Sequence, residues 1–224
     1  MDKDKRDVVD EEEYYQLTEK QRRYFYVKSI AGMIVGLVGL IVLSPVLLII
    51  ALAIKIEDGI HAPIIFSQKR VGVNGKHFKL YKFRSMKMDT PRDTATHLLR
   101  NPEKYITKVG KFLRKSSLDE LPQLVNIAKG EMAVVGPRPA LWNQDDLNAL
   151  RESYGVHQLK PGLTGYAQIT GRDELSIQDK AEKDSYYLKN FGVKQDIYCF
   201  FGTFLPVLRG DGIVEGREEH LEDE

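Results

Sequence analysis

The chain has a single cysteine, Cys199, and five scattered histidines among its 224 residues. An internal disulfide is therefore impossible, which suits a reducing compartment, and no histidine spacing matches a zinc site. The net charge of +1 gives no overall bias toward nucleic acid, and we expect no such partner. There is no internal repeat and no low-complexity linker. The length allows a membrane anchor and one domain with its own core.

The longest stretch without charge runs from Ile30 to Ile54. As a straight helix it would measure about 37 Å, enough for a hydrocarbon core of about 30 Å. Ser44-Pro45 interrupts it. Proline removes a backbone donor and clashes with the preceding turn, so we predict a kink or break there, with the Ser44 hydroxyl bonding a freed carbonyl. Either a kinked helix crosses the bilayer, or two short arms enter and leave on the same face.

The charges on both flanks favour the second geometry. Positive residues favour the cytoplasmic side of a membrane, and here they stand on both sides of the apolar stretch. They are Lys20, Arg22, Arg23 and Lys28 before it, and Lys55, Lys69, Arg70, Lys76 and Lys79 after it. We therefore expect a re-entrant hairpin over residues 24–56, preceded by a polar or interfacial segment at 1–23. The mixed aromatic and basic residues at 14–28 predict an interfacial helix leading in.

The remainder predicts a compact, mixed, helix-rich α/β domain over residues 57–210, followed by an acidic tail at 211–224. Short strands are predicted at 63–68 and 77–83, around a turn at 72–75, and at 132–135. Helices are predicted at 94–114 with a break near Pro102, at 121–129 up to Gly130, at 142–154 and at 177–188. Residues 160–171 are rich in glycine and proline and predict a loop. The apolar segment 196–208, with Pro206 inside, fits either the core or a second membrane-surface helix.

Asp119 and Glu120 are the first candidates for chemistry. Two adjacent carboxylates at a helix start can divide their roles, so that one reacts and the other holds a divalent cation. The alternative is a plain helix start, because Ser117 and Glu120 have the spacing of a capping box. Pro122 weakens that alternative, since it would fall after the first helical turn.

Clustered cations are the second signal. Arg70 lies between the first expected strand and the turn at 72–75, and alternation places Lys82 and Arg84 on one face of the second strand. In Gly136-Pro-Arg138-Pro139, two prolines fix the backbone of an arginine. Guanidinium groups bind phosphate oxygens bidentately, which indicates a diphosphate site. The alternative is a solvated or headgroup-binding face.

A loop with glycines and polar tips, Lys160 to Gln168 followed by Arg172, could bring backbone N–H groups close to a phosphate or nucleoside.

In this order, the motifs resemble the bacterial sugar transferase family. More narrowly, they resemble the small monotopic phosphoglycosyl transferases that start glycan assembly on a polyprenol carrier. The motifs are Ser44-Pro45, Gln68–Gly72, Lys82–Met86, Ser117–Gln123, Val135–Pro139 and Lys160–Gln168, and together they cover roughly residues 24–210. Tyr166 stands where many members have tryptophan, so an aromatic residue is kept. No multi-span segment precedes the anchor, so the resemblance implies the minimal catalytic form.

The resemblance implies that a UDP-sugar gives its sugar 1-phosphate to polyprenol (undecaprenyl) phosphate and releases UMP. This would be the first membrane step of a bacterial glycan pathway, such as exopolysaccharide, capsule or glycoconjugate synthesis. The re-entrant hairpin would anchor a monotopic enzyme in membrane lipid at the cytoplasmic face of the cell membrane. A homodimer is compatible with this picture. The residues do not specify the sugar, so glucose, galactose and N-acetylated amino sugars stay open.

In the implied mechanism Asp119 is the nucleophile and forms a phospho-sugar aspartyl intermediate, which predicts ping-pong kinetics. Glu120 would help to bind Mg²⁺. The phosphates and the nucleotide would be bound by Arg70, Lys82, Arg84, Arg114, Arg138, Gln168 and Arg172. Two alternatives stay open: a membrane-tethered module that binds anionic headgroups without catalysis, and a hydrolase that passes the sugar phosphate to water.

Overall fold

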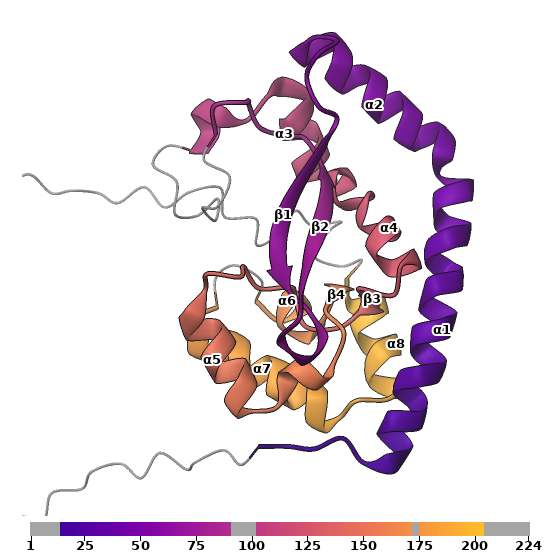
Figure 1. The fold of residues 1–224 in the computed structure, drawn as a ribbon, viewed down its shortest axis with the longest axis vertical. Helices are drawn as coiled ribbons and strands as arrows, with labels where there is room; N and C mark the ends of the chain where they lie inside the picture. The colour runs from indigo at the N-terminus through magenta and orange to yellow at the C-terminus, as the bar shows by residue number, and fades with distance from the viewer. Residues whose placement is uncertain (1–13, 91–101, 172–174, 204–224) are drawn as a thin grey trace, which may run out of the picture.

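The computed structural model describes residues 14–90, 102–171 and 175–203 (Figure 1). It is a helix-rich mixed α/β structure with one long apolar helix near its N-terminus. The expectations for residues 1–13, 94–101 and 204–224 and for Arg172 lie outside the described residues.

Helices α1 (Glu19–Val42) and α2 (Ser44–Asp58) form a bent arm along one side of the molecule (Figure 1). The predicted break is confirmed at Leu43, with Pro45 in the first turn of α2. Ser44 Oγ donates to the carbonyl of Ile41 at 2.8 Å, the carbonyl that a non-proline residue 45 would have bonded. The break is therefore satisfied locally.

The start of the predicted interfacial helix is wrong. Residues 14–18 are not helical, and α1 begins at Glu19 and continues without interruption into the apolar stretch. Thr18 and Gln21 form a capping box, in which the Thr18 hydroxyl accepts from the Gln21 backbone and the Gln21 side chain bonds back to residue 18. This reciprocal cap fixes the first turn at Glu19.

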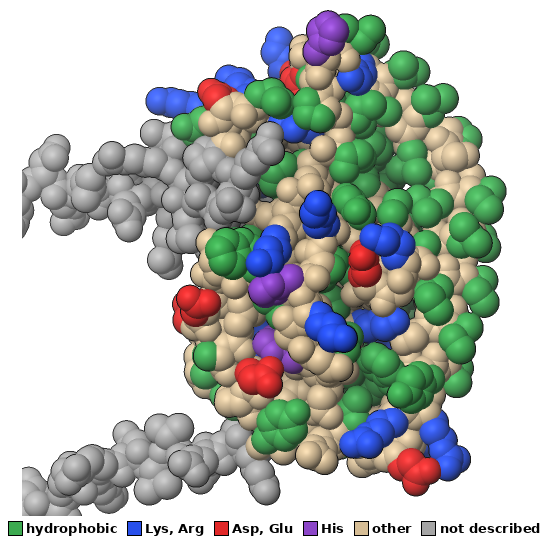
Figure 2. All heavy atoms as spheres, viewed as in Figure 1, with side chains coloured by type: hydrophobic (Ala, Val, Ile, Leu, Met, Phe, Trp, Pro, Cys, Tyr) green, Lys and Arg blue, Asp and Glu red, His purple; other side chains and the backbone are tan. Residues whose placement is uncertain are grey.

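α1 is long and apolar enough to cross a membrane, by length and composition. Apolar side chains of α1 and α2 are exposed and gather along the edge that these helices form (Figure 2). They include Ile34, Val38, Ile41, Leu48, Leu52 and Ile56. Exposed apolar side chains gathered in this way on two helices support association of the arm with a membrane.

The opposite side of α1 lies against α4 (Gln123–Ala128) through glycines. A Cβ on Gly36 would stand 2.6 Å from the backbone nitrogen of Ala128, and one on Gly39 would stand 3.3 Å from the Leu124 side chain. Only glycine allows so close an approach at residue 36. The apolar arm is therefore joined to the rest of the domain by direct backbone packing.

The predicted hairpin is confirmed. Strand β1 (Ile65–Val71) pairs antiparallel with β2 (His77–Phe83), and Val71 lies opposite His77 at the closed end. The bounds of β2 are as predicted, whereas β1 begins and ends later in the chain. Asn74 and Gly75 both have positive φ, 53° and 70°, which explains why Asn-Gly occupies this turn.

The predicted loop at 160–171 is wrong, because it contains strand β4 (Gly162–Thr164) and helix α6 (Tyr166–Ile169). β4 runs parallel to β3 (Ala133–Val135), the strand predicted at 132–135. A Cβ on Gly162 would lie 2.1 Å from the nitrogen of Gly136, and one on Gly165 would lie 2.1 Å from its carbonyl oxygen. These glycines permit close backbone packing of two segments. From the sequence alone, glycines with this role cannot be told apart from glycines in a loop.

Helices α5 (Asp145–Ser153), α7 (Ile177–Lys189) and α8 (Val193–Gly202) enclose the main core. The first two confirm the predicted helices, with α5 beginning later. Within the segment 196–208, residues 196–202 belong to α8, and one side of this helix contributes to the core. Cys199 is fully buried, whereas Tyr198 and Phe201 are exposed.

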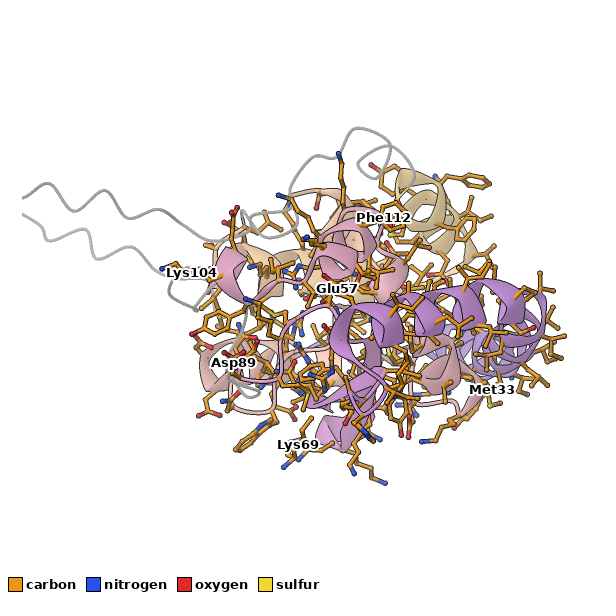
Figure 3. All side chains as sticks on the ribbon, turned by 90° about the horizontal axis from the view of Figure 1, so that it is seen from above. Met33, Glu57, Lys69, Asp89, Lys104 and Phe112 are labelled. Atoms are coloured by element: carbon orange, nitrogen blue, oxygen red, sulfur yellow. The ribbon has the colours of Figure 1, made fainter. Side chains whose placement is uncertain are left out.

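Within the helix predicted at 94–114, the described part is a 3₁₀ turn at Pro102–Tyr105 and α3 (Lys108–Lys115). Both carboxylate oxygens of Glu57, at the end of α2, accept from the first backbone nitrogens of α3, those of Lys108 and Val109, at 2.7 Å each. Figure 3 shows Glu57 close to the helix that carries Phe112. A carboxylate at a helix N-terminus is stabilising, so this contact fixes the far end of the bent arm to the domain.

Candidate active site

Asp119 and Glu120 lie on a single 3₁₀ turn, Leu118–Glu120, which stands before α4 rather than inside it. The capping-box interpretation is wrong. Ser117 has φ of 57°, a left-handed conformation, and its side chain caps no helix. α4 begins only after Pro122, which suits proline at a helix start. The two carboxylates are thus presented by a tight turn.

Three cations from separate elements converge on this turn. Lys82 Nζ, on β2, lies 2.7 Å from Glu120 Oε1 and 3.8 Å from Asp119 Oδ2. Arg138 Nη2 lies 3.1 Å from the same Glu120 oxygen. Arg114, at the end of α3, is close enough that its charge acts on Asp119. The structure therefore brings together five of the residues predicted for the site.

The pKa values of the two carboxylates move in opposite directions. Burial raises the pKa of Asp119, which is 6% exposed, and neighbouring Glu120 raises it further, against the opposing charges of Lys82, Arg114 and Arg138. Burial also acts to raise the pKa of Glu120, but the bonded charges of Lys82 and Arg138 outweigh it and hold that pKa well below its usual range. Glu120 is therefore ionised at neutral pH, and Asp119 is the more basic of the two carboxylates.

Arg70 lies beside this group and binds protein atoms with both ends of its fork. Nη1 donates to the carbonyl of Pro139 at 2.9 Å and Nη2 to Gln68 Oε1 at 2.6 Å. Burial and the charges of Arg138 and Arg151 lower its pKa to about 9, against the raising effect of Glu120. It therefore remains charged at neutral pH.

Arg84 and Lys82 have different partners, although alternation placed them on one face. β2 ends at Phe83, and Arg84 Nε donates to the carbonyl of Pro63 at 2.8 Å. Gln168, on α6, donates to the carbonyl of Leu163 at 3.0 Å, and its buried Oε1 accepts no hydrogen bond in the described part of the chain.

The sequence profile of the family described as bacterial sugar transferase matches residues 23–210. The chain belongs to this family.

Three relatives show how the match is distributed. The chain is 43% identical over 178 residues to the UDP-glucose:undecaprenyl-phosphate glucose-1-phosphate transferase of Escherichia coli, covering 76% of this chain and 37% of that protein. It is 35% identical over 202 residues to the undecaprenyl-phosphate galactose phosphotransferase of Salmonella typhimurium, covering 84% and 41%. It is 39% identical over 172 residues to the uncharacterized sugar transferase EpsL of Bacillus subtilis, covering 77% and 82%. The chain spans about two fifths of the first two relatives and most of the third.

In this bacterial sugar transferase, one charged pair near the site was missed by the sequence analysis. Arg151, on α5, and Asp184, on α7, form a buried ion pair of 2.6 Å. The available signal was the position of Asp184, which shares the buried face of α7 with Ala181 and Leu188 at helical spacing. A carboxylate on a buried face requires a partner.

The donor set of the turn fits a magnesium ion. Within the described ranges, no group of three or more Asp, Glu, His or Cys side chains is placed to coordinate a metal ion. Mg²⁺, however, is usually held by one or two carboxylates together with substrate phosphates and water. Both ion pairs of Glu120 use Oε1, so Oε2 lies outside them. Glu120 therefore offers a carboxylate oxygen for such a site.

Proposed function

We propose that this protein transfers a sugar 1-phosphate from a UDP-sugar to a polyprenol phosphate and releases UMP. The observation that carries the proposal is the buried Asp119, beside an ionised Glu120 and facing Lys82, Arg114 and Arg138. This arrangement suits an anionic diphosphate next to a nucleophilic carboxylate. The Escherichia coli and Salmonella relatives are both named as transferases acting on undecaprenyl phosphate, which supports the same reaction class.

In the first step, a carboxylate oxygen of Asp119 attacks the β-phosphorus of the UDP-sugar. The bond from that phosphorus to the bridging oxygen breaks, and UMP leaves with the bridging oxygen. The raised pKa of Asp119 makes it a more basic nucleophile than an ordinary aspartate. Arg138 and Arg114 would bind the phosphate oxygens as charge develops on them.

In the second step, a phosphate oxygen of the polyprenol phosphate attacks the phosphorus of the phospho-sugar aspartyl group. The bond to Asp119 breaks, the carboxylate is restored, and the product is a polyprenyl-diphosphate-sugar. Two displacements on one nucleophile predict ping-pong kinetics. Glu120, together with substrate phosphates, would hold Mg²⁺, which would supply positive charge beside the diphosphate and the departing phosphate.

The bent arm supports a re-entrant anchor with both ends on the cytoplasmic side. The break divides the uncharged stretch into residues 30–42 and 46–54, and each part alone is shorter than a hydrocarbon core of about 30 Å requires. α1 reaches a spanning length only when the residues before Ile30, which include Lys28, are counted. The exposed aromatic side of α8 would lie at the headgroup layer, where amphipathic aromatic residues are favoured. A shallow anchor holds the site at the height of the carrier's phosphate.

The test of the reaction is UMP release by purified protein with Mg²⁺, undecaprenyl phosphate and a panel of UDP-sugars. We expect UMP with one sugar and only when the lipid is present. Asp119→Asn should abolish it while the protein still binds UDP. UMP formed without lipid would indicate hydrolysis, and full activity of the Asp119→Asn variant would refute the assigned nucleophile.

The test of the anchor is cysteine labelling in a Cys199→Ser background. Arg23→Cys and Ile60→Cys stand on the two sides of the apolar arm. A membrane-impermeant maleimide should label both from the cytoplasmic side of inverted vesicles. Labelling of the two from opposite sides would establish a spanning helix instead.

A further inference from the structure

The segment that carries Arg138 is held at four successive carbonyl groups by donors from three parts of the chain: β1, α5 and β4. The bonds are Gly162 N to Pro137 O at 2.9 Å, Arg151 Nη1 to Arg138 O at 2.8 Å, Arg70 Nη1 to Pro139 O at 2.9 Å, and Val71 N to Ala140 O at 3.1 Å. Two prolines in the segment have fixed φ and no N–H of their own. Its position is therefore decided by what binds its carbonyls.

The bond to Arg138 itself comes from a charged side chain in the interior. Arg151 is 5% exposed, and its Nε and Nη2 both donate to Asp184 Oδ2, at 2.9 and 2.6 Å. That fork leaves Nη1 directed at the carbonyl of Arg138. A guanidinium is planar and rigid, so fixing one edge on a carboxylate fixes the direction of the remaining donor. Asp184 thus orients Arg151, and Arg151 orients the backbone of residue 138.

The stability of the folded protein does not explain why Arg151 and Asp184 form a buried ion pair. Replacing a buried ion pair with packed apolar residues is often neutral or stabilising, because desolvation offsets the attraction. The pair is also incompletely satisfied, since Asp184 Oδ1 is buried and has no hydrogen-bond partner among the residues described. Burial accordingly raises the pKa of Asp184 despite the charge of Arg151. The contribution of the pair is instead to direct the hydrogen bond from Arg151 Nη1 to the carbonyl of Arg138.

We propose that Arg151 and Asp184 are positioning residues for Arg138. They hold the backbone from which the Arg138 side chain, already 3.1 Å from Glu120, reaches the diphosphate of the donor. Neither residue would touch the substrate. The inference rests on the proposed function, which gives Arg138 a diphosphate to bind.

The test is a double-mutant cycle on the binding of UDP, measured by calorimetry with Mg²⁺ on the full chain. Arg151→Lys keeps a positive charge for Asp184, but one ammonium cannot replace three directed guanidinium donors. We expect Arg138→Ala to weaken UDP binding about tenfold, the loss of roughly one charge-assisted hydrogen bond. Arg151→Lys should weaken it by about three- to tenfold, and the double variant should bind no more weakly than Arg138→Ala alone.

Arg23→Lys is the matched control, because Arg23 forms an exposed ion pair with Glu19 on α1. It should leave the Kd for UDP unchanged. Should Arg151→Lys fail to fold, the pair Arg151→Met with Asp184→Leu removes both charges and fills the space. The same loss of UDP affinity and the same dependence on Arg138 are expected of it.

The positioning role would be overturned if Arg151→Lys weakened UDP binding equally with and without the Arg138 side chain. It would also be overturned if folded Arg151→Lys bound UDP with wild-type affinity, or if the wild type bound no UDP. The transferase reaction is judged separately by lipid-dependent UMP release. A coupled binding cycle in a protein that forms no UMP would leave the positioning role intact and refute the reaction. If UMP release depends on lipid but the effects of the two substitutions on UDP binding are additive, the reaction would be supported and the positioning role refuted.

Discussion

Neutralising the two carboxylates one at a time should change stability in opposite directions. Glu120 has a folded-state pKa below its unfolded value, so its ionisation contributes stability that is present above about pH 4.5 and lost as pH falls below it. Asp119 has a raised folded-state pKa, so its charge lowers stability as pH rises through that pKa. Glu120→Gln should therefore destabilise the protein at pH 7, and Asp119→Asn should stabilise it.

The size of the first effect follows from the geometry. The Glu120 side chain is 16% exposed and accepts charged bonds of 2.7 and 3.1 Å. The amide oxygen of glutamine can still accept, so we expect a loss of about 2 kcal/mol rather than the larger cost of removing a buried ion's partner outright. For a domain of this size, that loss lowers the Tm by about 4–8 °C.

The assay is thermal unfolding of each variant in one detergent, across pH 5 to 8. The deficit of Glu120→Gln should stay constant over this range, because Glu120 remains ionised throughout. The gain of Asp119→Asn should be largest at the upper end. A shift of both variants in the same direction at pH 7 would refute the electrostatic account of the turn.

Three further predictions address other parts of the molecule. Gly36→Val should separate α1 from α4, because the added Cβ would stand 2.6 Å from the Ala128 nitrogen. We expect faster hydrogen exchange in α4 and a lower Tm. Unchanged exchange would contradict the packing of α1 on α4. Arg138→Ala should raise the KM for the UDP-sugar about tenfold while the Tm stays near that of the wild type, since this side chain is 49% exposed; a large fall in Tm would assign it a structural role. The acid limb of the kcat–pH profile should lie above that of an ordinary aspartate, because Asp119 must be ionised to attack; a limb at the usual aspartate pKa would contradict its raised value.

Features with a local cause were predictable from the sequence. The break at Ser44-Pro45 follows from proline chemistry, the hairpin from Asn74-Gly75, and the end of α4 from Gly130, whose φ is 73°. The start of α1 at Glu19 was equally local, and the Thr18–Gln21 capping box could have revealed it.

Features that depend on distant partners were not predictable in the same way. The pairing of β3 with β4 joins short segments nearly thirty positions apart, and each is too short for a strand pattern. Gly162 and Gly165 are there for close backbone contact with Gly136, but from the sequence alone they indicate a turn. Tertiary contact decided the conformation in both cases.

The same distinction between local and distant causes applies to the residues of the site. Lys82 and Arg138, both predicted as phosphate-binding residues, lie beside the carboxylates in the structure. Arg84, which strand alternation placed on the same face as Lys82, donates from Nε to the carbonyl of Pro63. The Arg151–Asp184 pair carries no local motif, and its partners only become neighbours once α5 and α7 pack together.

The glycine contact between α1 and α4 links the chemistry to the physical state of the membrane. Backbone packed on backbone has no side chain that could absorb a displacement, so a tilt of α1 would be passed on to α4 and to the turn that precedes it. A re-entrant anchor lies within one leaflet, so its tilt depends on how the lipids of that leaflet pack. Turnover should therefore differ between loosely and tightly packed bilayers, through the turn that carries Asp119.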